Sequence, residues 1–445
     1  MKLKNAMSNN FDFEHYLKAG HGRAYLMAKE DPEKYRETIM NACRKDYTFD
    51  MQSEGSRAFL TADLISLFED PTPFINVAKE SFNSPDVDDV GNEIQYLSDL
   101  LIEFNQHKTV LDKYFALWEK IRETSYSDLM DFSSHLLSNV EYLAIKLLYD
   151  KPWKIADNIV KDMGRWYLTL DEDARNEFSW FYLKLEDQFG EDETREHLLM
   201  LAETSKEAKA FCDKDLKYEQ ESTGKVTVRR SSLSAFEAVE KLKADPELEL
   251  LPMGIRCIKD NEIVELAKAA VETDDLAIRA KIVSVFNTGR FAWPLDADYL
   301  LMWCNEGDPD LRQACHVAMS ELTSDRIRDY ASAYLRKDFD PFCLMMLIKN
   351  YKSEDEELIL SMLENVDITY EDKSQWHSIG STILDSYKIL PESILLWMYE
   401  STLCSWCRKS LIEDLIELGY ITDEIRNECM WDADLDIREL VNNSV

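Results

Sequence analysis

Apolar side chains recur every three to four residues along most of the chain, which is the period of an amphipathic α-helix. In the N-terminal half the pattern predicts helices over 13–29, 33–45, 57–69, 72–82, 90–106, 109–123, 126–149, 152–169, 172–189 and 192–213. These stretches share no common spacing, so we predict an irregular helical array. Glycine and proline number only 12 and 11 in 445 residues, which disfavours turn-rich β folds.

The C-terminal half adds a repeat of about 32 residues. Its anchor positions follow one another at 33, 32, 32, 32 and 30 residues: Arg279, Arg312, Leu344, Trp376, Arg408 and Arg438. Four residues before each anchor stand Asp275, Asp308, Asp340, Asp372, Cys404 and Asp434. Aspartate is a preferred helix N-cap, and the positions three and seven after each anchor are apolar and share one helix face. Each repeat is therefore predicted to hold a helix that begins at a capping residue and buries the same face.

A first helix is predicted before each of these, at about 262–272, 298–305, 327–336, 356–364, 393–400 and 424–430. Two helices in about 32 residues are typical of solenoid arrays. The opening Asp-x-x-x-Arg, as in Asp275 to Arg279, resembles the HEAT repeat family over roughly residues 260–445, although Leu344 and Trp376 depart from its arginine. The resemblance implies an all-α fold in which HEAT-like helix pairs form an α-solenoid after the irregular N-terminal array.

A polar, locally basic stretch separates the two halves. Residues 220–234 include Lys225, Arg229 and Arg230 and hold no helix pattern. We interpret them as an exposed loop or linker. The predicted organisation is thus an irregular helical region over 1–219, a linker over 220–234 and a HEAT-like repeat domain over 235–445.

The net charge of the chain disfavours some classes of binding partner and favours others. Its 86 acidic and 51 basic residues give a net charge of −35. Nucleic-acid binders carry a basic footprint, and anionic membranes repel an acidic surface, so both are disfavoured and a basic protein or peptide is favoured. No apolar run approaches the roughly 20 residues that span a bilayer. The nine cysteines follow no secreted framework, which predicts reduced thiols in a cytoplasmic protein.

Two polar groups in the N-terminal region are the candidate ligand-binding site. Its residues are His21, Arg23, Asp50, Gln52, Glu54 and Arg57. Carboxylates, an amide, an imidazole and guanidiniums together can bind a peptide terminus, a phosphate or a small polar ligand. The alternative is structural: Glu54 caps a helix or forms an ion pair, Arg57 makes a structural ion pair, and the glycines turn the chain. No nucleophile or metal set accompanies the carboxylates, so no catalytic residue is predicted.

The sequence Cys404-Ser405-Trp406-Cys407 is a C-x-x-C string, which is half of a zinc site or a redox pair in many proteins. No second pair with metal spacing accompanies it. The repeat explains both residues, because Cys407 falls in the buried column that holds Cys343 and Cys404 takes the cap position. We interpret them as core cysteines and predict no metal and no cofactor.

These observations favour a non-catalytic scaffold that binds a basic protein or peptide. In this interpretation the anchor arginines form a structural ladder with the cap aspartates of adjacent repeats. Two other classes stay open: a nucleic-acid-binding or DNA-processing HEAT-like protein, by analogy of fold alone, and an enzyme or small-ligand binder that uses the N-terminal polar cluster.

Overall fold

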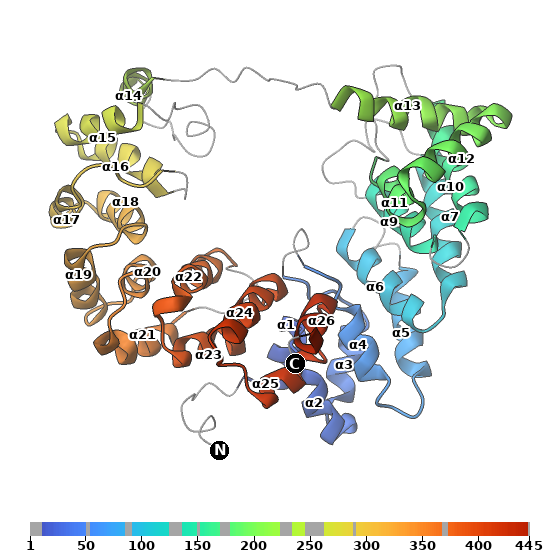
Figure 1. Cartoon of the computed structure of the whole chain (residues 1–445), viewed down its shortest axis with the longest axis horizontal. Coiled ribbons are helices and arrows are strands. Elements are labelled where there is room, and N and C mark those ends of the chain that lie inside the picture. The colour runs from blue at the N-terminus through green and yellow to red at the C-terminus, as the bar shows by residue number, and fades with distance from the viewer. Residues whose placement is uncertain are drawn as a thin grey trace. The chain divides into compact units, whose positions relative to one another are not determined.

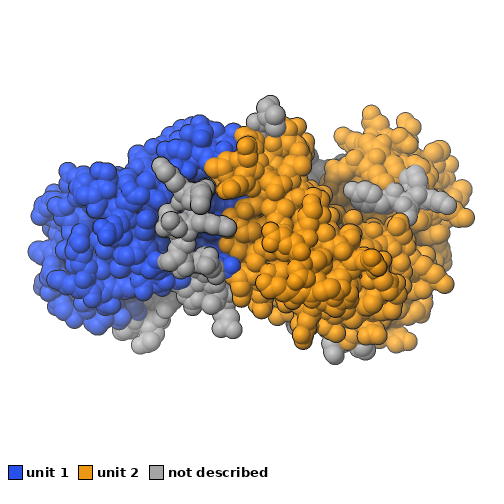
Figure 2. All heavy atoms as spheres, turned by 90° about the horizontal axis from the view of Figure 1, so that it is seen from below, with its two compact units in different colours: residues 1–11, 228–421 blue, residues 12–227, 422–445 orange. Residues whose placement is uncertain are grey.

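The computed structural model describes residues 11–49, 54–84, 91–123, 136–148, 152–169, 179–222, 234–244, 262–287, 291–366 and 373–443 (Figure 1). Within these ranges the ordered elements are helices and no strand occurs, which confirms the all-α prediction. The chain divides into two compact units, coloured separately in Figure 2. Unit 1 holds Met1–Phe11 and Val228–Ile421, and unit 2 holds Asp12–Thr227 and Thr422–Val445.

Unit 1 is built from helix pairs. Its α-helices are α14 (Ala235–Ala244), α15 (Ile263–Glu272), α16 (Leu276–Val283), α17 (Asp298–Trp303), α18 (Pro309–Ser320), α19 (Asp325–Leu335), α20 (Pro341–Lys349), α21 (Glu356–Leu363), α22 (Lys373–Ser386), α23 (Glu392–Ser401) and α24 (Ser405–Glu417). Short 3-10 turns are η6 (Ser284–Asn287), η7 (Ser353–Asp355) and η8 (Tyr387–Ile389). The helices expected from the repeat are confirmed here to within a few residues at each end.

The second helices of successive pairs pack on one another in chain order. Helix α16 contacts α18, α18 contacts α20, α20 contacts α22, and α22 contacts α24. Helices α19, α21 and α23 form the neighbouring row, which Figure 1 shows alongside. Three residues of the anchor column face the interior, because Leu344, Trp376 and Arg408 are at most 1% exposed. Burial of this column joins each pair to the next.

Aspartates cap the second helices as the repeat predicts. The side chain of Asp275 accepts hydrogen bonds from the amides of Ala277 and Ile278. Asp308 and Asp340 cap α18 and α20 in the same manner. These carboxylates satisfy backbone N–H groups that the first helical turn leaves without partners. Asp372 lies outside the described residues.

Three anchor arginines bind backbone carbonyls, which the predicted ladder with cap aspartates did not include. They donate to the carbonyl six residues earlier, in the turn between the two helices of their own pair: Arg279 to Thr273, Arg408 to Thr402 at 3.2 Å, and Arg438 to Asp432 at 2.5 Å. The prediction of pairing with cap aspartates of adjacent repeats is wrong for Arg279 and Arg438. The guanidinium instead satisfies carbonyls that the end of the first helix leaves open.

Unit 2 holds the remaining helices. They are α1 (Phe13–Ala19), α2 (Arg23–Glu30), α3 (Arg36–Ala42), α4 (Ala58–Ile65), α5 (Thr72–Phe82), α6 (Gly91–Glu103), α7 (His107–Glu123), α9 (Leu136–Leu147), α10 (Pro152–Tyr167), α11 (Ser179–Phe189), α12 (Glu191–Thr204), α13 (Lys206–Ser222), α25 (Asp423–Cys429) and α26 (Leu435–Asn443), with the 3-10 turn η2 (Pro32–Tyr35). The stretch expected as one helix over 13–29 breaks at Gly20, whose φ of 68° ends α1. Helix α13 extends into the expected linker, of which residues 223–233 lie outside the described residues.

Helices α25 and α26 pack against the N-terminal helices of unit 2, whereas the sequence placed them in the domain over 235–445. The ring of Tyr25 stacks on Trp431 with centroids 3.7 Å apart. Two parallel hydrogen bonds of 2.7 and 3.0 Å join the Arg23 guanidinium to the Glu428 carboxylate. A Cβ atom on Gly22 would lie 1.8 Å from the Glu428 carbonyl oxygen, so this contact needs glycine. The sequence pattern predicts this helix pair, but it does not predict that the pair packs against the N-terminal helices.

Two further contacts hold this helix pair. The amide of Ala433 donates to the Gly20 carbonyl at 2.8 Å, and Arg438 donates to the Asp63 carboxylate of α4 at 2.7 Å. Among the described residues, no helix has the length and apolar character to cross a membrane.

Candidate functional site

A cavity of about 270 Å³ opens in unit 2 between the segment after α3, the start of α4, and helices α6 and α9. Its lining residues are Asp46, Thr48, Glu54, Gly55, Ser56, Phe59, Gln95, Tyr96, Asp99, Tyr142 and Lys146. Three carboxylates and one ammonium group are the charged groups of this lining, which we call the acidic pocket. Its volume is near the lower end of small-molecule sites, which span roughly 300–1,000 Å³, and suits a single side chain.

Asp99 is the buried centre of one wall. Lys146 Nζ lies 2.6 Å from Asp99 Oδ1, and the Tyr142 hydroxyl donates to Asp99 Oδ2 at 2.8 Å. Tyr142 and Lys146 are four residues apart on α9 and so share one helix face. Burial and the neighbouring carboxylate raise the pKa of Tyr142, which keeps its hydroxyl a proton donor. The charge of Asp99 is thereby compensated within the protein.

Glu54, which also lines the pocket, is likewise compensated. Its carboxylate forms an ion pair with Arg57, and both side chains are buried, at 0% and 3% exposure. The Arg57 guanidinium also packs against Gly20, where a Cβ atom would lie 2.3 Å from one of its nitrogens. This ion pair fixes the backbone before α4 and thus one edge of the pocket.

Asp46 differs from the other two carboxylates because no cation pairs with it among the described residues. Its Oδ1 accepts the amide of Thr48 at 2.9 Å and the Thr48 hydroxyl at 2.8 Å. Burial raises the pKa of Asp46, the Thr48 hydrogen bonds and Arg57 oppose that rise, and Glu54 adds to it. A cation entering the pocket would relieve the cost of keeping this carboxylate ionised.

Glu93 does not line the pocket, but its carboxyl interacts electrostatically with Asp46. Its Oε2 is buried and accepts no hydrogen bond from any described residue. Burial raises the pKa of Glu93, and the charge of Asp46 raises it further. Burial and the charge of Asp99 raise the pKa of Glu103 in the same way. Carboxyl groups that destabilise one another's charge create a site that favours an added positive charge.

The six residues that were expected to form one ligand site differ in their locations and partners. Glu54 lines the acidic pocket and Arg57 pairs with it. His21 is fully buried, and its Nδ1 accepts the amide of Arg23 at 3.1 Å. Arg23 turns to Glu428 of α25 and to the Tyr16 hydroxyl, so it is part of a structural ion pair. Asp50 and Gln52 lie outside the described residues.

The other pocket residues were not among those predicted from the sequence. Asp99 stands among leucines in a stretch predicted as an amphipathic helix, and a carboxylate on an apolar helix face signals a buried partner. Tyr142 and Lys146 have the i, i+4 spacing that marks a shared face. Asp46 carries no such signal, because it lies in an irregular segment.

Comparisons with protein-family models, with curated proteins and with solved structures gave no match to the chain.

Proposed function

We propose that this protein is a non-catalytic helical-repeat scaffold that binds a basic protein or peptide, and that the acidic pocket accepts a lysine or arginine side chain of that partner. The observation that carries the proposal is the carboxylate of Asp46, which faces a cavity and has no cationic partner among the described residues. The partly buried Glu93, which interacts with it electrostatically, adds a second carboxylate to be neutralised.

The architecture supports a binding role. Rows of packed helix pairs in unit 1 are consistent with a HEAT-like solenoid, a fold that presents long surfaces built from one face of stacked helices. We propose that unit 1 is such a solenoid. A net charge of −35 raises the local concentration of cationic partners and speeds their encounter.

The pocket geometry supports recognition of one cationic side chain. Asp99 and Glu54 are held by Lys146 and Arg57, so they shape the walls without needing the ligand. Phe59 and Tyr96 supply apolar surface for a methylene stem. The carboxylate of Asp46, which no cation of the described residues neutralises, is then the group that meets the ammonium or guanidinium head.

The direct test is fluorescence anisotropy of the full chain with a labelled peptide of alternating lysine and glycine. The same peptide with acetylated lysines keeps the length and loses the charge. We expect the lysine peptide to bind, with weakening as salt rises, and the acetylated peptide not to bind. Equal binding of both peptides would exclude recognition of the cation.

A variant pair locates the binding. Asp46→Asn with Glu93→Gln removes two charges at the pocket and preserves side-chain shape. Asp192→Asn with Glu69→Gln removes two exposed charges of the same kinds elsewhere in unit 2. We expect at least a tenfold loss of affinity in the pocket variant and less than a twofold change in the control. Equal losses would assign the binding to general electrostatics and reject the pocket.

A further inference from the structure

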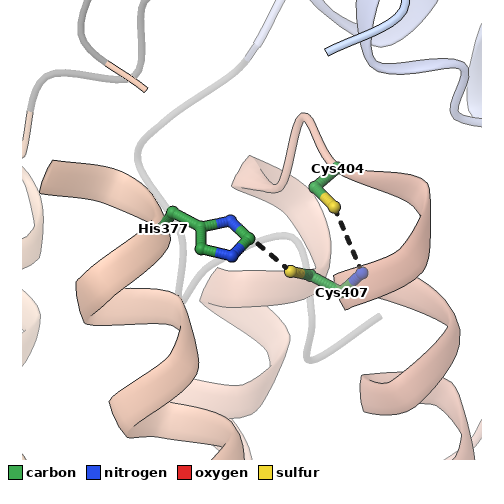
Figure 3. A group of neighbouring side chains, drawn as sticks. All are labelled: His377, Cys404 and Cys407. Carbon is green, nitrogen blue, oxygen red and sulfur yellow. Dashed lines mark hydrogen bonds between the residues drawn. The ribbon is translucent and has the colours of Figure 1, made fainter. Parts of the chain in front are cut away.

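A histidine from one helix and two cysteines from another meet in unit 1, away from the acidic pocket. His377 lies on α22, and Cys404 and Cys407 lie at the start of α24 (Figure 3). Cys407 Sγ is 4.0 Å from His377 Nδ1, and Cys404 Sγ accepts the amide of Cys407 at 3.4 Å. One ligand atom from each residue lies within 4.8 Å of the other two. The sequence showed the C-x-x-C string but not the histidine that completes it.

We propose that His377, Cys404 and Cys407 bind a zinc ion. Tetrahedral zinc, with bonds of about 2.3 Å to sulfur and about 2.0 Å to nitrogen, holds such ligands roughly 3.5–3.8 Å apart. The spacing of the three atoms approaches this value, so small side-chain rotations suffice. Two thiols and one imidazole form a soft donor set that suits Zn²⁺ and not Mg²⁺ or Ca²⁺. Both thiols lose their protons on binding, so two protons are released for each ion.

The repeat itself provides a comparison for this site. Asp340 and Cys343 hold the same two repeat positions, at the cap and three residues later, and His316 of the preceding second helix faces them. There the cap is a carboxylate, and His316 Nδ1 lies 3.1 Å from Asp340 Oδ2. Its Nε2 lies 2.8 Å from the Tyr330 hydroxyl, so both ring nitrogens have close partners. That cluster is a closed, buried hydrogen-bond network.

The cluster at α24 differs from it in two respects. Cysteine replaces aspartate at the cap, which exchanges a strong hydrogen-bond acceptor for a soft metal ligand. His377 is exposed, whereas His316 is buried. Solvent can therefore supply a water as the fourth ligand, or a partner can supply a side chain. The C-x-x-C spacing places both thiols at the first turn of α24, where backbone N–H groups stabilise thiolates.

The test is cobalt titration of the full, reduced, metal-free chain, because Co²⁺ reports tetrahedral thiolate ligands through its absorption bands. Zinc is then added to displace the cobalt. We expect one equivalent of Co²⁺ with a thiolate-to-cobalt charge-transfer band and strong visible bands, which one equivalent of Zn²⁺ abolishes. Proton release of two per zinc, measured in a weakly buffered solution, is the independent readout.

Three variants make the test specific. Cys404→Ser keeps a good helix cap and removes one thiol, and His377→Ala removes the exposed ligand. Cys343→Ser changes a buried cysteine at the repeat position of Cys407, outside the proposed site, and is the control for the loss of a buried thiol. We expect at least a tenfold loss of metal affinity in the first two and no loss in the third. Absence of the charge-transfer band in the unaltered protein, or an unchanged cobalt affinity and band intensity in Cys404→Ser, would overturn the proposal.

Discussion

Asp340 and Cys404 stand at the same position of two helix pairs and cap the helix that follows each of them. Asp340 Oδ1 accepts the amide of Cys343 at 2.8 Å, and Cys404 Sγ accepts the amide of Cys407 at 3.4 Å. Sulfur is the weaker acceptor, so α24 has a poorer cap than α20. A ligand role for Cys404 gives a reason for that substitution.

The first prediction concerns the cap of α24. Without metal, Cys404→Ser should leave stability unchanged or raise it by about 0.5 kcal/mol, because serine is a better cap. With zinc in excess the order should reverse, because only the unaltered protein gains the free energy of metal binding. Urea unfolding in a chelator and in zinc measures both differences. The same order under both conditions would mean that zinc does not act through Cys404.

The second prediction concerns the contact between Gly22 and α25. Gly22→Ala places a Cβ atom against the Glu428 carbonyl and should destabilise the docking of α25 and α26 by about 1–3 kcal/mol. Faster hydrogen exchange in peptides covering 423–443 would report this. Gly55→Ala is the control, because its added Cβ meets no atom within 4 Å. Unchanged exchange in Gly22→Ala would show that the close contact does not hold the helix pair.

The third prediction uses two arginines at one repeat position. Arg279 is buried and donates to the Ala270 and Thr273 carbonyls and to Glu306. Arg279→Met should destabilise unit 1 by about 1.5–3 kcal/mol, because it leaves these acceptors without a donor. Arg312 is half-buried and forms no side-chain hydrogen bond with a described residue, so Arg312→Met should change stability by less than about 0.5 kcal/mol. Urea denaturation compares the two, and equal effects would contradict the interpretation.

The fourth prediction is a pH dependence set by His316. Burial lowers the pKa of this imidazole, but the hydrogen bonds to Asp340, Cys304 and Cys343 outweigh burial and raise it above its ordinary 6.5. Tyr330 and Tyr334 are its other close neighbours. The charged His316 therefore stabilises the fold fully below pH 6.5, and this contribution falls as pH rises, by up to about 1.4 kcal/mol per unit.

His316→Gln tests that pH dependence. The difference in unfolding free energy between the unaltered protein and the variant should shrink steadily from pH 6 to pH 8. Urea titrations at three pH values give this difference. A difference that stays constant over the range would show that folding does not shift the pKa of His316, and a difference that grows with pH would show that His316 is neutral in the folded protein.

The fifth prediction is that loss of the Asp46 charge raises the stability of the fold and weakens binding at the acidic pocket. Because burial raises the pKa of Asp46, ionising it costs more in the folded than in the unfolded protein. Asp46→Asn should therefore raise the melting temperature at pH 7 and leave it unchanged at pH 3, where the carboxyl is neutral in both states. The same variant should bind the lysine peptide more weakly. A lower melting temperature at pH 7 would show that Asp46 stabilises the fold instead.

Periodicity predicts the helices of unit 1 well because the same spacing of apolar and capping residues recurs in each repeat. The capping aspartates Asp275, Asp308 and Asp340 fix where helices begin, and the structure places them as expected. The sequence does not predict the hydrogen-bond partners of the anchor arginines. Every residue has a backbone carbonyl, and the sequence does not show which carbonyl lies within reach of a guanidinium. The Arg279 guanidinium donates to the Thr273 carbonyl because the turn between α15 and α16 brings that carbonyl within reach.

The sites depend on contacts between distant segments, which a single sequence does not specify. Glu54 was identified, but Asp99 and Lys146 join it only because α6 packs on α9. His377 reaches Cys407 because α22 packs on α24. Both groups of residues can be recognised as sites only when the packing of the two helices is known.

The ion pair between Arg23 and Glu428 joins positions 405 residues apart, and this separation has a consequence for synthesis on the ribosome. At roughly 5–20 residues per second, about 20 to 80 seconds pass between the emergence of the two halves of this contact. During that interval Tyr25 lacks the ring of Trp431 that covers it in the finished protein. The N-terminal helices therefore complete this contact only after the late segment has left the ribosome.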